Sequence, residues 1–197
     1  LIVPIGEWVM LEACRQLAQW RAAGLPVERV AVNLSARQMH VGDVAQQINR
    51  ILDDCGLPPG CLDIEITESL AMEQPERTRA LLLSLKQRGI TLSMDDFGTG
   101  YSSLGYLKQY PLDVLKIDRS FVRDIATDPN DAAIVSTIIA MARSLNLTVL
   151  GEGIETEAQR QFLLQQGCRH GQGYLFGRPV SAAEMEALLS ATQQTGA

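Results

Sequence analysis

The sequence has 197 residues, of which 46% are hydrophobic and 20% are charged, a composition typical of one globular domain with a sizeable core. Its net charge of −6, without a run of Lys and Arg, argues against a protein that binds long nucleic acid through its phosphates. No apolar run approaches the roughly 20 residues of a membrane-spanning helix, and no signal-peptide pattern is present, so we expect no membrane contact. The four cysteines form neither a CxxC pair nor a zinc-like cluster, which indicates a reduced, cytoplasmic setting.

Strand-like and helix-like segments alternate along the chain. The spacing of apolar residues and the positions of Gly and Pro predict helices over 1–20, 44–55, 75–88, 131–145, 156–166 and 181–192. Strands are expected at 30–35, 61–68, 89–92, 113–118, 147–152 and 168–174, and a frayed tail at 193–197. Such an alternation is typical of a parallel sheet.

The predicted strands carry polar residues toward their carboxyl ends. These are Asn33, Glu65, Asp95 with Asp96, Lys116, Glu152 and Gln172. Functional side chains gather at that face of a (β/α)8 barrel, whereas a doubly wound open sheet would have a Gly-rich phosphate turn after its first strand, and none occurs here. We therefore expect one α/β domain of the TIM-barrel type over residues 1–197. Six strands are predicted and a barrel needs eight, so we expect the first two to precede Leu1 in a longer protein.

Two adjacent carboxylates, Asp95 and Asp96, follow the third predicted strand. Neighbouring side chains of a strand point to opposite faces, so both can serve one site only if the strand ends or bulges there. Gly98 and Gly100 come next and allow backbone conformations that other residues avoid. The pair predicts a hard metal ion at the strand end, and a polar turn with an Asx-type cap is the alternative.

The side chains expected at the strand ends include carboxylates and an amide but no Cys/His set. Such oxygen ligands suit Mg²⁺ or Mn²⁺ rather than zinc. Four acids at one barrel mouth repel each other without cations, and two metal ions close together are suited to cleaving a phosphodiester. Lys116 would hold or deprotonate the attacking water, with a pKa lowered by burial, or stabilise the transition state by its charge. A Schiff-base aldolase with Lys116 as its nucleophile is the chemical alternative.

Six motifs occur in one order along the chain. They are NLSARQ from Asn33, EITE from Glu65, DDFGTGYSSL from Asp95, KID from Lys116, EGIET from Glu152 and QGYLF from Gln172. Together they resemble the EAL-domain family of bacterial cyclic di-GMP phosphodiesterases over nearly the whole chain. The resemblance implies a modified (β/α)8 barrel. It also implies hydrolysis of one phosphodiester bond of cyclic di-GMP to linear pGpG, with two Mg²⁺ or Mn²⁺ ions and a metal-activated water.

By motif position, the resemblance implies roles for individual residues. The metal ligands would be Asn33, Glu65, Asp95 and Asp96. The catalytic residues that hold the nucleophilic water would be Lys116 and Glu152. The anchor of the Asp96–Tyr101 loop would be Glu68, and the supporting residues would be Glu155 and Gln172. Substrate contacts are expected from Ser35, Arg37 and Gln38.

One motif of the family falls outside the sequence. The family takes its name from an early Glu-Ala-Leu motif whose Glu is a metal ligand, and we expect this motif before Leu1. A catalytically silent cyclic di-GMP receptor is therefore the alternative to an enzyme. The resemblance also implies a homodimer, formed through the region after the DDFGTG-type loop, and sensory or GGDEF domains in the same chain.

Overall fold

A computed structural model describes residues 1–40, 42–99 and 104–195 of the chain. By its internal contacts the chain divides into two compact units. Unit 1 comprises Leu1–Ile64, Ser84–Thr91 and Pro179–Ala197. Unit 2 comprises Glu65–Leu83 and Leu92–Arg178. Among the described residues, no helix combines the length and the apolar character needed to cross a membrane.

Six strands are present in the described part of the chain. They are β1 (Val30–Asn33), β2 (Leu62–Thr67), β3 (Thr91–Phe97), β4 (Val114–Ile117), β5 (Thr148–Gly151) and β6 (His170–Gly171). They form one sheet in the order β1-β2-β3-β4-β5-β6. The pairs β3–β4, β4–β5 and β5–β6 are parallel. The α/β fold with a parallel sheet, predicted from the alternation of elements, is thereby confirmed.

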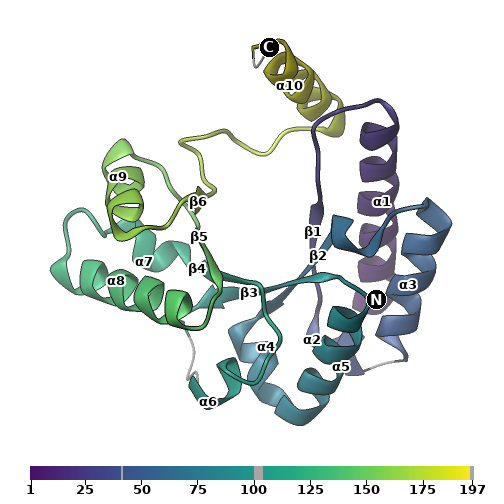
Figure 1. Ribbon diagram of the computed structural model, residues 1–197, viewed down its shortest axis with the longest axis horizontal. Coiled ribbons are helices and arrows are strands. Elements are labelled where there is room, and N and C mark those ends of the chain that lie inside the picture. The colour runs from purple at the N-terminus through teal and green to yellow at the C-terminus, as the bar shows by residue number, and fades with distance from the viewer. Residues whose placement is uncertain (41, 100–103, 196–197) are drawn as a thin grey trace. The chain divides into compact units, whose positions relative to one another are not determined.

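Unit 1 is built mainly of helices. They are α1 (Ile2–Ala22), α2 (Ala36–His40), α3 (Val44–Cys55), the 3₁₀ helix η1 (Pro59–Cys61) and α10 (Ala182–Thr195). Helices α1 and α3 lie side by side and pack against each other (Figure 1). Cys14 and Leu17 of α1, and Ile48 and Leu52 of α3, are fully buried. Their spacing of three and four residues places each pair on one helix face, which forms the core of this unit.

The bounds of α3 agree with the predicted helix over 44–55 because both ends carry local signals. At its start, the Asp43 side chain accepts a hydrogen bond of 2.9 Å from the backbone N–H of Gln46. At its end, Gly56 adopts a left-handed conformation with φ of 64°, which a residue without Cβ does at little cost. Local capping signals therefore define both ends of this helix.

Unit 2 places three helices on one side of its strands. Its helices are α4 (Glu68–Glu73), α6 (Leu104–Leu107), α7 (Arg119–Arg123), α8 (Pro129–Ser144) and α9 (Glu157–Gln166), while α5 (Pro75–Gln87) and β2 are each divided between the units. Helices α7, α8 and α9 lie on the same side of β4, β5 and β6 (Figure 1), and α8 packs against both β4 and β5. The buried face of α8 consists of Val135, Ile138, Ile139 and Ala142.

The structure differs from the predicted elements at three places. Strand β3 continues to Phe97, beyond the expected end at residue 92. Strand β6 has only two residues, because the rest of the predicted strand at 168–174 follows an irregular path. Helix α10 reaches Thr195, three residues beyond the predicted helix end at residue 192, and residues 196–197 lie outside the described part, so the expected frayed tail stays a prediction.

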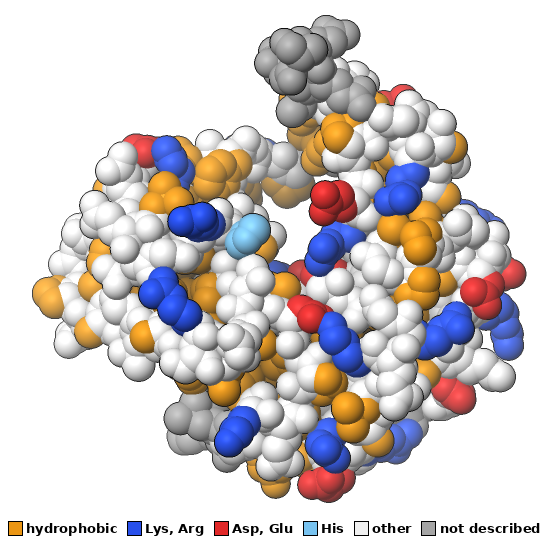
Figure 2. Space-filling view, in the orientation of Figure 1, with side chains coloured by type: hydrophobic (Ala, Val, Ile, Leu, Met, Phe, Trp, Pro, Cys, Tyr) orange, Lys and Arg blue, Asp and Glu red, His pale blue; other side chains and the backbone are white. Residues whose placement is uncertain are grey.

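The distribution of charge can be followed on one face of the molecule. Figure 2 shows Lys and Arg side chains separated from one another by hydrophobic and uncharged surface. The visible face therefore presents no continuous basic stripe.

Candidate active site

A β-bulge brings the two adjacent aspartates to one site. Met94 of β3 pairs with Leu115 of β4, and Phe97 pairs with Ile117. Asp95 and Asp96 therefore lie opposite a single residue, Lys116, and the register shifts between the two paired positions. Asp96 has a positive φ of 53°, which is uncommon for a residue with a side chain. The strand therefore bulges at this point and does not end there, which is one of the two arrangements expected to let both aspartates serve one site.

Lys116 lies at the centre of a cluster of acids. Its Nζ atom is 2.9 Å from Glu65 Oε1, 3.0 Å from Asp95 Oδ1 and 2.8 Å from Glu152 Oε1. Only 5% of the Lys116 side chain is exposed. We call Glu65, Asp95, Asp96, Lys116 and Glu152 the acidic cluster; all five belong to unit 2. The sequence predicted these residues at strand ends, and the structure brings them together.

The charge state of Lys116 follows from these contacts. Burial acts to lower the pKa of its ammonium group, but the hydrogen bonds that this group donates to Glu152, Glu65 and Asp95 outweigh burial and raise the pKa above its ordinary value. Lys116 is therefore a cation at neutral pH. The expectation of a lowered pKa was therefore wrong, and a cationic Lys116 suits stabilisation of negative charge better than deprotonation of water. A Schiff-base nucleophile must be a neutral amine, so the raised pKa also speaks against the aldolase alternative.

Burial and mutual repulsion both act on the carboxylates of the cluster. Burial raises the pKa of Glu152, and the charges of Asp95 and Glu65 add to this, while Lys116 opposes it. Burial also raises the pKa of Asp96, followed by the charges of Asp95 and Asp118. One lysine thus leaves the acids incompletely neutralised, which is the electrostatic condition for binding a cation.

Asp118 belongs to this neighbourhood, although the sequence assigned it no role. It precedes α7 and caps that helix, because its Oδ1 atom accepts a hydrogen bond of 2.9 Å from the backbone N–H of Ser120. Burial tends to raise its pKa, but the bonds from Ser120 and from the Asp96 side chain lower it. Asp118 lies two residues after Lys116 in the sequence. In a strand this spacing places two side chains on one face, and it is the sequence signal from which a role for Asp118 could have been inferred.

Glu68 contacts the loop that follows the bulge. Its side chain is almost fully buried, with 1% exposed, and its Oε2 atom accepts a hydrogen bond of 2.8 Å from the backbone N–H of Gly98. The Thr99 hydroxyl donates to the backbone oxygen of Asp96 over 2.8 Å, which closes the turn. The far part of the expected Asp96–Tyr101 loop, residues 100–101, lies outside the described residues.

The two residues expected to support the site differ in position. Gln172 directly follows β6, and its Nε2 atom donates a hydrogen bond of 2.6 Å to Glu152 Oε1. Glu155 has an exposed side chain, and its backbone N–H donates to Gln159 Oε1 over 2.8 Å. The structure thus joins Gln172 to the acidic cluster, whereas the interaction shown for Glu155 is one of its backbone.

The segment Asn33–Gln38 lies in unit 1 and is organised locally. Asn33 ends β1 with an exposed side chain, and Arg37 is also exposed. Gln38 Oε1 accepts hydrogen bonds from the Ser35 hydroxyl over 2.6 Å and from the Ser35 backbone N–H over 3.1 Å. Gln38 is 4% exposed, so its amide serves the shape of this turn.

The donor set fits a hard divalent cation. One carboxylate oxygen each of Asp95, Asp96 and Glu152 lies within 4.8 Å of the others, and Glu65 reaches the same lysine. Carboxylate oxygens without thiolate or imidazole partners are the ligands that Mg²⁺, Mn²⁺ and Ca²⁺ prefer. Lys116 is the competing cation at this place, so an arriving metal ion would have to displace part of its ion pairs.

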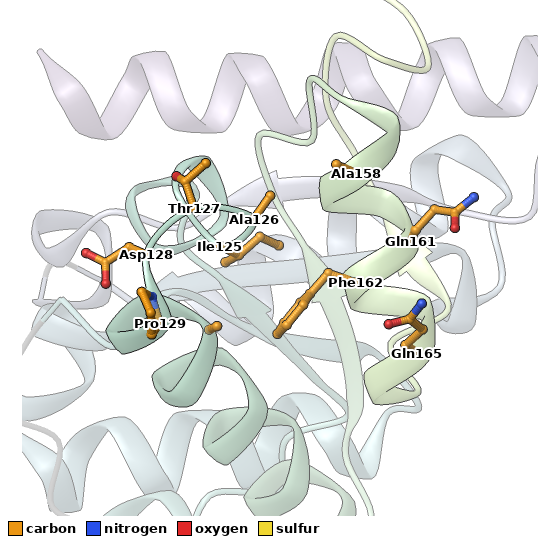
Figure 3. Close-up of a pocket in the computed structure, with 10 residues that line it drawn as sticks. Ile125, Ala126, Thr127, Asp128, Pro129, Ala158, Gln161, Phe162 and Gln165 are labelled. Carbon is orange, nitrogen blue, oxygen red and sulfur yellow. The ribbon is translucent and has the colours of Figure 1, made fainter.

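A separate hollow in unit 2 has different chemistry. A space of about 430 Å³ opens between the α7–α8 connection and α9 (Figure 3). Phe162 reaches from α9 toward α8, and Gln161 and Gln165 stand along the same helix. Its one carboxylate, Asp128, caps α8 through a 2.8 Å bond from the backbone N–H of Asn130. The hollow shares no residue with the acidic cluster, which remains the candidate active site.

Comparison with known proteins agrees with this geometry. The bifunctional diguanylate cyclase/cyclic di-GMP phosphodiesterase MucR of Pseudomonas aeruginosa is 48% identical over 185 residues, which cover 94% of this chain and 27% of MucR. The cyclic di-GMP phosphodiesterase PdeR of Escherichia coli is 40% identical over 186 residues, which cover 94% of this chain and 28% of PdeR. The chain thus spans about a quarter of the length of the curated relatives it matches.

Solved structures show the same likeness. The phosphodiesterase of MucR in complex with c-di-GMP matches with a TM-score of 0.90 and 48% identity, over 94% of this chain and 75% of that chain. BlrP1 of Klebsiella pneumoniae in complex with manganese and cyclic di-GMP matches with a TM-score of 0.77 and 32% identity, over 88% of this chain and 45% of that chain. The model of the EAL domain matches residues 1–179, and this chain therefore belongs to the EAL domain family.

Proposed function

We propose that this chain is the catalytic domain of a cyclic di-GMP phosphodiesterase that produces linear pGpG. The observation that carries the proposal is the acidic cluster, in which buried Lys116 joins Glu65, Asp95 and Glu152 beside Asp96. Relatives that are 40–48% identical bear the name of this activity. A phosphodiester that carries negative charge fits a site that holds both a fixed cation and acids able to bind further cations.

The proposed division of labour assigns Asn33, Glu65, Asp95 and Asp96 to two Mg²⁺ or Mn²⁺ ions, which when bound would supply Lewis-acid stabilisation of the phosphate oxygens. Lys116 and Glu152 would hold the attacking water as its donor and its acceptor, and their side chains lie next to each other, with Nζ 2.8 Å from Oε1. Glu152 is the better proton acceptor of the two, because Lys116 is a cation with a raised pKa. Gln172 orients Glu152 through its amide.

Unit 1 would supply the substrate contacts. Ser35 and Gln38 form a hydrogen-bonded turn that follows β1, and Arg37 presents an exposed guanidinium, which suits a phosphate or a guanine edge. Glu155 is retained as a supporting residue on the resemblance of its motif alone. Ser35, Arg37 and Gln38 are therefore assigned to substrate binding, whereas Asn33 of the same segment is assigned to the metal ions together with acids of the acidic cluster.

The protein that carries this chain is proposed to be larger. The matched region covers 75% of the MucR phosphodiesterase structure, which supports two further strands and a closed (β/α)8 barrel. The name of MucR combines a diguanylate cyclase with the phosphodiesterase, which supports sensory or GGDEF domains in the same protein. We expect it to work as a homodimer in the cytoplasm, where its four free cysteines remain reduced.

The proposal is tested by following pGpG formation from cyclic di-GMP with the full-length protein in Mg²⁺ or Mn²⁺. Lys116→Ala and Asp95→Ala should each abolish product, whereas Lys108→Ala, which changes an exposed lysine outside the cluster, should leave turnover unchanged. Absence of turnover in the wild type, with tight cyclic di-GMP binding measured by calorimetry in the absence of metal, would establish a receptor instead of an enzyme.

A further inference from the structure

The backbone just past the bulge lies directly against an aromatic ring. Gly98 follows β3 with a φ of 101°. A Cβ atom built on it would lie 2.7 Å from Cε2 and 3.2 Å from Cζ of Phe121, and 3.5 Å from Cδ1 of Ile138. The first distance is shorter than real Cβ contacts allow, so the ring occupies the space that any other residue would need.

A second contact holds the same peptide group from another element. The backbone N–H of Gly98 donates to Glu68 Oε2 over 2.8 Å, and this carboxylate comes from α4. Phe121 comes from α7 and Ile138 from α8. Gly98 is thus held by a charge-assisted hydrogen bond, and on its other side Phe121 and Ile138 fill the space that a Cβ atom would enter.

The bulge needs such restraint because it is strained. Asp96 has a positive φ of 53°, a conformation that costs free energy for a residue with a Cβ atom and persists only where the surroundings impose it. This strain favours a different path of the backbone, and the neighbours of Gly98, two residues later, oppose that change.

We propose that Phe121 is a positioning residue for the metal site: with Ile138, its ring forms a seat for Gly98 that keeps Asp95 and Asp96 in their bulged arrangement. The proposal rests on the proposed function in that it takes the two aspartates as metal ligands. It assigns to α7 a task besides packing. Within that helix Val122 is fully buried, whereas Phe121 is partly exposed, so the core of α7 is formed by its neighbour and the ring is available to the loop.

The test measures Mn²⁺ binding to the metal-free full-length protein by calorimetry, which needs neither substrate nor turnover. Phe121→Ala should weaken Mn²⁺ binding by about 10-fold or more, the scale on which residues behind metal ligands act. Phe121→Leu, which keeps an apolar side chain at the seat, should restore most of the affinity. Val122→Ala is the matched control, because it removes buried apolar volume from the same helix and should lower Tm without changing the Mn²⁺ Kd.

Equal Mn²⁺ affinities in wild type and Phe121→Ala, or an equal loss in Val122→Ala, would overturn the proposal. A double-mutant cycle gives an independent measurement. The new Cβ atom of Gly98→Ala clashes with the ring in the wild type, whereas in the Phe121→Ala background it keeps only an ordinary contact of 3.5 Å with Ile138 Cδ1. The backbone strain of alanine at φ of 101° is present in both. The two substitutions should therefore be non-additive in Mn²⁺ affinity, and additivity would also overturn the proposal.

These readouts separate the proposal from the activity on which it rests. If the Phe121 variants bind Mn²⁺ more weakly than the wild type but the wild type forms no pGpG, the proposed phosphodiesterase activity is refuted and the positioning role of Phe121 stands. A wild type that forms pGpG, with Mn²⁺ affinity independent of Phe121, would refute the seat alone.

Discussion

The acidic cluster and the segment Asn33–Gln38 reach their shapes by opposite means. The cluster draws Glu65, Asp95, Lys116 and Glu152 from four strands or strand ends, and its geometry depends on a buried ammonium group shared by three carboxylates. The segment lies within one turn of chain, and its polar groups pair with their own neighbours. Charge shared across a sheet determines one region, and local hydrogen bonding determines the other.

This difference separates two kinds of expected defect. Substitutions in the cluster should change stability, metal affinity and the chemical step together, because each charge balances several others. Substitutions in the segment should change substrate binding while leaving the charges of the cluster untouched. The following variants are ordered from the largest expected effect to the smallest.

Lys116→Met should have the largest effect. It leaves Glu65, Asp95 and Glu152 without their common cation, and removing one partner of a buried ion pair costs about 3–5 kcal/mol. We expect the free energy of unfolding of the metal-free protein to fall by about 3 kcal/mol, and kcat to fall at least about 100-fold. Chemical denaturation in chelator and in Mn²⁺ checks this, since Mn²⁺ should restore much of the stability by replacing the missing charge. If Lys116→Met is as stable as wild type in chelator, the three ion pairs do not contribute to the free energy of unfolding.

Glu68→Ala should lower turnover and weaken Mn²⁺ binding while the fold remains intact. The substitution deprives the backbone N–H of Gly98 of its buried acceptor, at a cost of about 1–3 kcal/mol. Mn²⁺ calorimetry, pGpG formation and circular dichroism measure the three quantities. Glu73→Ala, at the exposed end of the same helix α4, is the control and should behave as wild type. Unchanged kinetics in Glu68→Ala would show that the loop makes no contribution to the site.

Gln38→Ala should act on substrate binding alone. It removes the acceptor for the Ser35 hydroxyl and backbone N–H, and a lost hydrogen bond of this kind is worth about 1 kcal/mol. We expect KM for cyclic di-GMP to rise several-fold with kcat unchanged, the signature of an interaction equal in ground state and transition state. Gln46→Ala, an exposed glutamine of the same unit, controls for loss of the amide. A lower kcat in Gln38→Ala would mean that this segment contributes to the chemical step as well as to substrate binding.

Asp96→Asn should have the smallest effect on stability, and its sign depends on pH. The pKa of Asp96 is raised from its ordinary value of 3.8 by burial, then by the charges of Asp95 and Asp118. A carboxyl group with a raised pKa binds its proton more tightly in the folded state, so its contribution to stability is lost as pH rises from the ordinary pKa through the raised one. Metal-free Asp96→Asn should therefore be more stable than wild type at neutral pH, by up to about 1 kcal/mol.

Urea denaturation of both proteins from about pH 3 to about pH 7 in chelator measures this difference, which should vanish below the ordinary pKa of aspartate. Saturating Mn²⁺ should reverse the order, because wild type gains a ligand that the variant lacks. A variant less stable than wild type throughout, with and without metal, would show that Asp96 acts through its hydrogen bonds and not through its charge.

The sequence predicted the parts of the fold that local rules determine. The helix over 44–55 was found with both ends, because Asp43 and Gly56 cap it. The bulge was anticipated because two adjacent acids with a common task conflict with the alternation of a strand. The grouping of acids followed from strand order alone, since the carboxyl ends of parallel strands meet at one edge.

Other features depend on contacts that are distant in sequence. The raised pKa of Lys116 requires acids from three other strands or strand ends, and a lysine in isolation suggests the opposite shift. The short helices α2, α4 and α7 have five or six residues, too few to show helical periodicity. Phe121 and Gly98 lie close together although a strand and a helix separate them in the sequence, and no local sequence pattern predicts this proximity.

The bulge in β3 also changes the number of acidic residues that lie opposite Lys116. In a regular pair of strands, each residue of one strand has one counterpart on the other, so Lys116 would face a single aspartate. The extra residue gives Lys116 two counterparts, Asp95 and Asp96. Because Glu65 and Glu152 also pair with Lys116, the inserted position adds a further acid to a site that already holds more acids than cations, without any new charged residue on β4. The register between β3 and β4 thus contributes to the negative charge that favours cation binding at this site.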